Sequence, residues 1–373
     1  MAVFGITTVR TSSPLNQLML ASFAANPTDR LLLRLVVFED EATSADKEAG
    51  NWVAVLPRPD YLPWPHLQCT QKILQWLRHA SRAFPHVQII GQMDSDTWIQ
   101  PQRLATYLAS VATAVPPSAL FWGGLFEHWQ RLDTNGTIDC VGFSMDSPGA
   151  VSHWRETNKW YLRRSEAERR ADSFAMAQGG FYFYSRGAAK RLLEFVLSPD
   201  RASNGGDGLL QQLATPPRHD NRGKQRRSGQ YKSPPDPCDA ILGWIGARAF
   251  EGMPLHAVSA SLNLEYYPFP IFTRFNTAHG LVVHGVKAGA RVDATIDWYR
   301  WRVGNATTPP PPQITCRPTR WLHSRSSKWS LCHNVAPCSD PGDTLISNAS
   351  VPWLPAAVRD VCKGQRLQAE GGG

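Results

Sequence analysis

The chain has 373 residues, of which 42% are hydrophobic and 19% charged, and its net charge is +8. This composition excludes an intrinsically disordered protein and predicts one large domain with something smaller attached. No apolar run reaches the roughly 18 residues that a membrane-spanning helix needs, so we expect no transmembrane segment. The positive charge favours anionic partners, such as nucleotide phosphates, polyanions or lipid surfaces, without identifying one.

Strand and helix patterns alternate along the first third of the chain. In order, they are a strand at Val3–Val9, a helix opened by the cap Thr11–Pro14, a strand at Leu31–Phe38, a helix across Leu67–Phe84, a strand at Val87–Met93, a helix from Pro101 and a strand at Ala119–Phe126. This alternation predicts an α/β fold with a mixed, mostly parallel sheet flanked by crossover helices.

Two carboxylates follow the strand Val87–Met93, in the run Asp94-Ser95-Asp96. In open α/β sheets ligands bind beyond the carboxyl ends of the strands. A helix cap ahead of Pro101 would explain at most one carboxylate, and poorly, because Asp96 lies five residues before that proline. Like charges this close repel, and a divalent cation carrying a phosphate would make the pair favourable. We therefore predict a metal–phosphate site here.

The later part of the chain holds five recognisable segments. They are a glycine pair entering an aromatic strand at Gln178–Ser185, a basic run at 217–235, a helix at Cys238–Phe250, a short strand at Leu281–His284 and a proline run at Pro309–Pro312. The basic run has no aliphatic residue, which predicts a solvated, disordered insertion. It lacks the interleaved aromatic residues of nucleic-acid binders, so we expect no nucleic-acid partner.

Four of the seven cysteines gather near the end of the chain, at Cys316, Cys332, Cys338 and Cys362. Their clustering predicts two disulfides and a secretory compartment, with the pairing left open. A metal site with His323 and His333 is the less favoured alternative, because no pair of cysteines has the two-residue spacing of a zinc ribbon.

Four segments carry a family resemblance. They are Thr70–Leu108, which includes Asp94-Ser95-Asp96-Thr97, then Gln178–Leu193, Cys238–Gly243 and Val282–Lys287. In this order they resemble glycosyltransferase family 31, the beta-1,3-galactosyltransferase and Fringe group, over roughly residues 3 to 300. The chain departs from the family at Ser95, where an aspartate is usual, at Cys238, where a glutamate is usual, and in lacking the arginine-rich run after the first strand. These departures bear on the donor more than on the reaction.

The resemblance implies a division of the chain and a reaction. A GT-A-like catalytic domain would occupy 1–305, with 217–235 as its insertion, followed by a proline-rich linker at 306–314 and a small disulfide-containing module at 315–373. The reaction would be an inverting transfer of a hexose, of galactose or N-acetylhexosamine type, from a UDP-sugar to a hydroxyl of a glycan or glycoprotein. The family implies the Golgi or another secretory lumen, with an N-terminal anchor absent from this sequence.

The resemblance also assigns roles to residues. Asp94, Ser95, Asp96, Gly179 and Gly180 would bind the nucleotide-sugar, with Asp94 reaching the ribose or a metal-bound water. Asp96 and His284 would hold the metal, and imidazole ligation favours Mn²⁺ over the alternative Mg²⁺. Asp239 would be the base that deprotonates the acceptor. The structural alternatives are a satisfied histidine at a strand end for His284 and a helix N-cap for Asp239.

Two other classes of function stay open at this point. One is a catalytically inactive GT-A-like domain that binds a sugar or nucleotide, which the residues Ser95 and Cys238 suggest. The other is a polyanion-binding protein built around the basic insertion.

Overall fold

The computed structural model describes residues 1–8, 11–25, 28–59, 68–99, 101–134, 137–144, 173–197, 238–259, 264–266, 282–284, 313–318 and 328–335. The helices are α1 (Pro14–Ala25), α2 (Ser44–Glu48), α3 (Gln68–Ala83), α4 (Pro101–Ala114), α8 (Arg186–Leu197) and α11 (Cys238–Ala249). The strands are β1 (Ala2–Thr7), β2 (Leu31–Phe38), β3 (Val53–Leu56), β4 (Ile89–Asp94), β5 (Thr97–Ile99), β6 (Phe121–Thr134), β7 (Thr137–Ser144), β8 (Ser173–Ser185), β9 (Pro254–Ser259), β10 (Leu264–Tyr266), β11 (Val282–His284), β12 (Gln313–Pro318) and β13 (Lys328–Val335).

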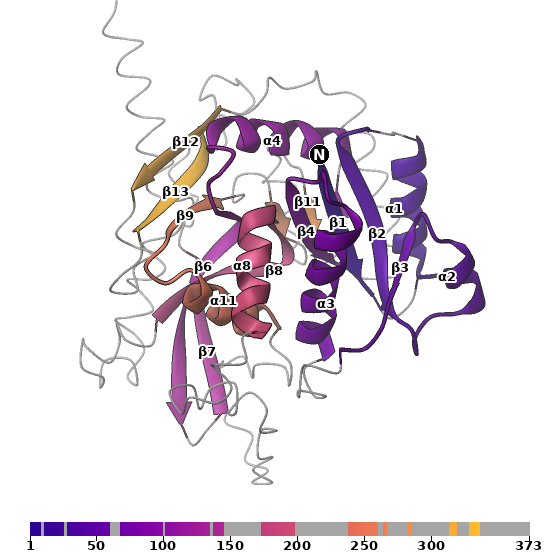
Figure 1. The fold of residues 1–373 in the computed structure, drawn as a ribbon, viewed down its shortest axis with the longest axis horizontal. Coiled ribbons are helices and arrows are strands. Elements are labelled where there is room, and N and C mark those ends of the chain that lie inside the picture. The colour runs from indigo at the N-terminus through magenta and orange to yellow at the C-terminus, as the bar shows by residue number, and fades with distance from the viewer. Residues whose placement is uncertain are drawn as a thin grey trace, which may run out of the picture.

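A ten-stranded sheet forms the centre of the described structure, in the order β12-β13-β9-β6-β8-β4-β1-β2-β3, with β7 paired to β6 (Figure 1). Its parallel pairings outnumber the antiparallel ones, which involve β7, β8 and the β12–β13 pair. A second sheet has the order β10-β11-β5. This architecture confirms the predicted α/β class with a mixed, mostly parallel sheet flanked by helices.

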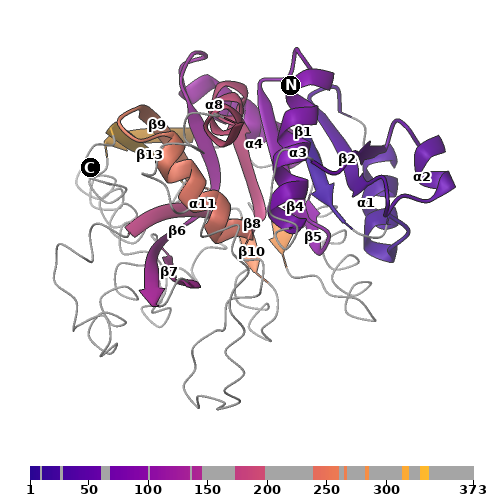
Figure 2. The same ribbon diagram turned by 60° about the horizontal axis from the view of Figure 1, so that its bottom comes forward.

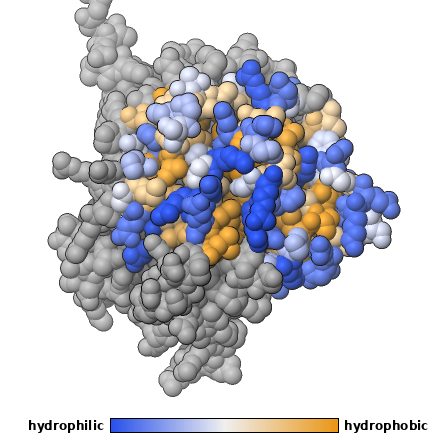
Figure 3. Space-filling view, viewed as in Figure 1, coloured by the Kyte–Doolittle hydropathy of each residue, from blue (hydrophilic) through white to orange (hydrophobic). Residues whose placement is uncertain are grey.

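Helices cover both faces of the large sheet, and each face has its own hydrophobic core. The core on one face contains buried residues of α3, α8 and α11, and the core on the other contains those of α1 and α4. The side of α3 and α8 that is turned away from the sheet is hydrophilic in Figure 3. These helices therefore have the amphipathic character that the sequence periodicity predicts.

The first helix shows why the local prediction succeeds. Ser13 caps α1, because its Oγ accepts a hydrogen bond from the backbone N–H of Asn16 over 3.3 Å, and Pro14 takes the first helical position. The face that carries Leu15, Met19 and Phe23 is buried. Proline at the start of a helix loses no hydrogen bond, since that N–H would have no partner within the helix.

Two glycines let large aromatic rings lie directly against the strands that lead to the candidate site. A Cβ added at Gly5 on β1 would collide with the ring of Trp76, and one at Gly91 on β4 would collide with the ring of Phe4. The indole Nε1 of Trp76 also donates to the carbonyl oxygen of Gly91 over 2.8 Å. Helix α3 is thereby fixed on β1 and β4.

Several elements were not predicted from the sequence. They are α2, β3, β5, β7, β9 and β10, and β6 continues well beyond the predicted Ala119–Phe126. Strands β12 and β13, from the part of the chain assigned to a separate module, extend the large sheet, because β13 pairs in parallel with β9. The division into domains as a whole stays a prediction, and the basic insertion at 217–235 lies outside the described residues.

The tail contains one of the predicted disulfides. Cys316 on β12 and Cys332 on β13 lie opposite each other and are disulfide-bonded. Cys338 and Cys362 lie outside the described residues, so a second bridge between them stays a prediction. Cys69 on α3 is disulfide-bonded as well, which the sequence analysis did not anticipate. In the described part of the chain, no helix is long and apolar enough to cross a membrane.

Candidate functional site

Asp94 is the last residue of β4 and lies at the edge of the sheet where neighbouring strands also end. Thr7, the last residue of β1, is paired with Asp94 in parallel register, and β2 runs parallel to β1 on its other side. Asp94, Ser95 and Asp96 are all partly exposed. Carboxylates at the carboxyl ends of parallel strands occupy the usual ligand-binding edge of such a sheet.

A buried glutamine connects the ends of β1 and β4. The Nε2 of Gln92 donates to Thr7 Oγ1 over 3.0 Å and to Asp94 Oδ1 over 3.1 Å. Asp94 is therefore tied to β1 by side-chain hydrogen bonds as well as by the strand ladder. Gln92 was not predicted as a site residue, although its place two residues before an aspartate, on the same face of the strand, is a signal for such a contact.

The short sheet brings two distant predicted residues together. After the turn that contains Asp96, β5 pairs antiparallel with β11, and Thr97 lies opposite His284. Tyr266 on β10 is paired with His284 from the other side. The backbone of His284 therefore lies beside the residue that follows Asp96.

The glycine pair reaches the same edge of the large sheet. Strand β8 runs antiparallel to β4, with Phe181 opposite Met93, so Gly180 lies next to the end of β4. The hydroxyl of Thr97 donates to the carbonyl oxygen of Gly180 over 2.7 Å, and this contact is buried. The aspartate turn and the glycine pair, Gly179 and Gly180, are thus joined through the first residue of β5.

Helix α11 directs its first turn, which contains Asp239, toward this edge as well. β9 runs parallel to β6, and the short connection from Ala249 to Pro254 joins the end of α11 to the start of β9. The helix must therefore run back along the sheet, with its N-terminal end at the edge where β4 ends; Figure 2 shows α11 crossing from the side of β9 to the side of β10. The helix begins at Cys238, so Asp239 is inside its first turn, one residue past the first helical position.

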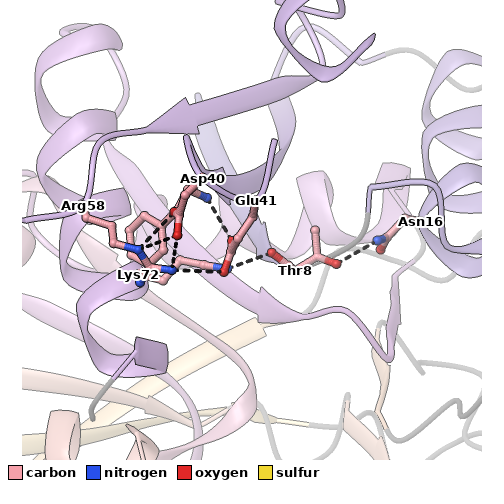
Figure 4. A network of polar contacts seen from close by, with 7 residues as sticks. Thr8, Asn16, Asp40, Glu41, Arg58 and Lys72 are labelled. Atoms are coloured by element: carbon pink, nitrogen blue, oxygen red, sulfur yellow. Dashed lines mark hydrogen bonds and ion pairs between the residues drawn. The ribbon is translucent and has the colours of Figure 1, made fainter. Parts of the chain in front are cut away.

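A buried lysine fixes the loops that follow β1 and β2 (Figure 4). The Nζ of Lys72 on α3 donates to the carbonyl oxygen of Thr8 over 2.9 Å and lies 2.5 Å from Glu41 Oε2. It also lies 5.0 Å from the centroid of the Phe38 ring. Burial lowers the pKa of Lys72, and the hydrogen bond to Glu41 opposes that shift. On the other side, the buried Asn16 donates to Thr8 Oγ1 over 3.2 Å.

An exposed ion pair borders this lysine. Arg58 lies 4.6 Å from the Phe38 ring centroid and its Nε donates to both carboxylate oxygens of Asp40, over 3.0 and 2.9 Å. The hydrogen bond from Arg58 lowers the pKa of Asp40. Lys72 lies within the segment Thr70–Leu108 that carries the family resemblance, but its partners were not predicted. The signal was available, because an acidic run follows β2 and Lys72 stands on an otherwise buried helical face.

The loop after β1 is anchored on its far side by a buried aspartate. Asp46, in the first turn of α2, accepts hydrogen bonds from the hydroxyl of Thr11 and from both the backbone N–H and the hydroxyl of Thr43, the latter two over 2.8 Å. Gln17 donates to the carbonyl oxygen of Thr11 over 3.0 Å. Burial acts to raise the pKa of Asp46, but the hydrogen bonds from Thr11 and Thr43 outweigh it, and the net shift is downward.

The residues predicted to hold a metal are of types that bind a hard divalent cation. Asp94 and Asp96 are partly exposed carboxylates, and His284 comes from the adjacent strand, a set of oxygen and nitrogen donors that suits Mn²⁺ or Mg²⁺. Among the described residues, a different group of possible ligand atoms lies on His256, Cys316 and Cys332, within 4.8 Å of one another. Its two sulfur atoms are joined in the disulfide, so they are not available as thiolate ligands.

The comparison with protein families matches the central part of the chain. Residues 66–205 match the family model described as Galactosyltransferase, which confirms the predicted resemblance over that segment. The matched segment contains Asp94, Asp96 and the glycine pair, whereas Asp239 and His284 lie beyond it. No curated protein sequence matches the chain.

Among solved structures, the similarities are distant. Mouse xyloside xylosyltransferase 1 shares 12% identity and a TM-score of 0.37, over 76% of this chain and 96% of that one. A glycosyltransferase involved in glycosylation of the major capsid of PBCV-1 shares 8% identity and a TM-score of 0.29, over 80% and 98%. Mannose-1-phosphate geranyltransferase from Thermus thermophilus shares 13% identity and a TM-score of 0.27, over 57% and 66%. TM-scores this low do not support a functional assignment, which rests on the sheet and on the match to the family model.

Proposed function

We propose that the protein is a metal-dependent inverting glycosyltransferase, because residues 66–205 match the model of the galactosyltransferase family, a family of hexosyltransferases. It would transfer a hexose, of galactose or N-acetylhexosamine type, from a UDP-sugar to a hydroxyl of a glycan or glycoprotein. The observation that carries the proposal is the pairing of β5 with β11, in which Thr97 lies opposite His284. It supports a shared site for Asp96 and His284, which stand far apart in the sequence.

On the donor side, Asp96 and His284 would hold the cation, Mn²⁺ or alternatively Mg²⁺. A divalent cation neutralises charge on a departing diphosphate. Asp94 would accept a hydrogen bond from a ribose hydroxyl or from a metal-bound water. The glycine pair would allow the backbone of β8 to approach the sugar closely, because glycine has no side chain to keep a ligand away.

On the acceptor side, Asp239 would remove the proton from the attacking hydroxyl. A hydroxyl is a weak nucleophile until a positioned base accepts its proton. With one carboxylate at the reacting centre, the hydroxyl attacks the anomeric carbon directly as UDP leaves from the opposite face, and the product has the inverted configuration. The direction of α11, whose first turn lies at the edge of the sheet where β4 ends, supports this role.

The family suggests the lumen of the Golgi or of another secretory compartment as the place of action. The Cys316–Cys332 disulfide agrees with an oxidising compartment, where such bonds persist. The proposed partners are a UDP-sugar donor and a glycan or glycoprotein acceptor.

The decisive test is a panel of UDP- and GDP-sugars, with Mn²⁺, with Mg²⁺ and with a chelator present. We expect hydrolysis of one UDP-hexose in the presence of Mn²⁺, its loss with the chelator, and transfer once the right acceptor is added. Asp96→Asn keeps the shape of the side chain and removes its charge. This variant should therefore lose the metal-dependent hydrolysis. Metal-dependent UDP binding without hydrolysis or transfer of any sugar would instead support the inactive sugar- or nucleotide-binding domain.

A further inference from the structure

Gln92 contacts Asp94 at the candidate site and has no part in the proposed reaction itself. It stands on β4 two residues before Asp94, and its side chain is completely buried. One nitrogen, Nε2, donates to the hydroxyl of Thr7 over 3.0 Å and to Asp94 Oδ1 over 3.1 Å. A side chain enclosed in this way has little rotational freedom, so it holds the Asp94 carboxylate in one direction relative to β1.

The orientation of the Gln92 amide follows from the carboxylate that it faces. Both protons of Nε2 are used by Thr7 and Asp94, while Oε1 has no hydrogen-bond partner among the described residues. The reversed amide would set Oε1 against Asp94 Oδ1, and two acceptors in contact repel. In the present orientation Nε2 faces the Asp94 carboxylate, which is favourable, but Oε1 is buried without a hydrogen-bond partner among the described residues. Buried unmatched polar atoms are rare in proteins, and one beside a binding edge calls for a functional explanation.

We infer that Gln92 is a positioning residue for Asp94: it sets the carboxylate toward the donor nucleotide before the nucleotide arrives. This inference rests on the proposed function, because it takes Asp94 to be a donor-binding residue. Groups that hold a binding side chain in place contribute to affinity without touching the ligand. Gln92 is buried and would act through Asp94, so its loss should weaken donor binding and leave the chemical step unchanged.

The experiment compares Gln92→Met and Gln92→Leu with the native protein, using calorimetric binding of UDP in the presence of Mn²⁺. Both variants fill a similar volume without an N–H donor. We expect the Kd of UDP to rise roughly 10- to 100-fold, by analogy with the loss seen when groups that support metal ligands are replaced. The KM for the donor should rise in parallel, with kcat at saturating donor and the KM for the acceptor unchanged. Melting temperatures establish that each variant is folded.

The matched control is Gln75→Met. Gln75 is another buried glutamine, on α3, whose Nε2 donates to the carbonyl oxygen of Pro57 over 3.2 Å. Its replacement should leave UDP binding unchanged. Equal loss of affinity in the Gln75 and Gln92 variants would indicate general damage to the fold and overturn the inference.

A double variant tests whether Gln92 acts through Asp94. In an Asp94→Asn background, Gln92→Met should cause little further loss of UDP affinity, because the carboxylate that it positions is gone. Additive losses would contradict the inference, and so would native affinity in Gln92→Met, while both would leave the proposed function standing. Failure of the native protein to bind UDP with any divalent cation would overturn the proposed function, and this inference with it.

Discussion

The hydroxyl of Thr97 donates to the carbonyl oxygen of Gly180 over 2.7 Å, and this buried hydrogen bond joins the strand after the aspartate turn to the glycine pair of β8. The same residue lies opposite His284 in the short sheet. Thr97 is therefore a junction of three chain segments that the proposed donor site needs.

Replacing Thr97 by valine tests that junction. Valine has nearly the same shape but cannot donate, so a buried carbonyl oxygen loses its partner, which costs about 1–3 kcal/mol of unfolding free energy. Urea unfolding should show this loss for Thr97→Val, whereas Thr97→Ser, which keeps the hydroxyl, should lose less. Equal stability of the native protein and Thr97→Val would mean that this contact contributes nothing.

The proposed cation ligands should differ in their importance. Asp96→Ala should abolish activity and the Mn²⁺ dependence of UDP binding while the protein stays folded, because Asp96 is partly exposed. His284→Ala should weaken metal affinity less completely, because the carboxylate oxygens stay in place. The measurement is calorimetric titration of UDP with and without Mn²⁺. Unchanged Mn²⁺ dependence in both variants would refute the assignment.

For Asp239 the informative variant is Asp239→Asn. Asparagine keeps the shape of the side chain but cannot accept a proton, and loss of a general base lowers the rate by about 10²- to 10⁴-fold. The rate of transfer at saturating acceptor should fall by that factor, with donor affinity and melting temperature nearly unchanged. If Asp239 only stabilises the start of α11, turnover should stay near the native value, and the substitution should cost at most the roughly 0.3–1 kcal/mol that a carboxylate contributes in the first turn of a helix.

The buried Asp46 predicts a dependence of stability on pH. Burial raises its pKa, but the hydrogen bonds from Thr11 and Thr43 outweigh it, so the folded-state pKa lies below the ordinary 3.8. A carboxyl with a lowered pKa stabilises the fold above its unfolded-state pKa and loses that contribution as pH falls through the folded-state value. Asp46→Asn should therefore cost about 1 kcal/mol near neutral pH, and the difference from the native protein should shrink below about pH 4. Denaturant unfolding across this range measures it, and a difference that grows toward acid would contradict the assignment.

The tail disulfide should contribute measurably to stability. Cys316 and Cys332 are separated by 16 residues in the sequence, and closing a loop of this size stabilises by about 3 kcal/mol. The variant Cys316→Ala/Cys332→Ala should show this loss in denaturant unfolding. Peptide mapping under non-reducing conditions should also find Cys338 and Cys362 bonded. Free thiols at both would refute the second bridge.

The sequence predicted the central part of the fold well because the rules that it used are local. The strand Leu31–Phe38 was predicted with the bounds that β2 has, since a continuous apolar run in an α/β protein is a strand buried on both faces. Helices α1 and α4 begin where a proline takes the first helical position. Strand β5 was missed because its three residues form a strand only by pairing with β11, which no local pattern reveals.

The residues of the candidate site also differ in whether a local sequence pattern could predict them. Asp94 and Asp96 were predicted from their place after an apolar strand, whereas His284 and Asp239 came from the order of segments in a family. Lys72, Glu41 and Gln92 were missed as interacting groups. Their contacts depend on α3, β1, β2 and β4 meeting at one edge, and a single sequence gives no measure of which polar side chains face one another there.

The pairing of β5 with β11 also has a consequence for the order of events during synthesis. Strands β1, β2, β3 and β4 are synthesised well before β11. The pairings of β2 with β1 and with β3 span short stretches of chain and form quickly. β11 emerges much later, and its pairing closes a long loop, a slow step because chain entropy opposes it. A nascent chain can thus form most of the large sheet before His284 has been synthesised. On the proposed function, the protein can hold the cation, and so use a donor, only after β11 has been made and has paired with β5.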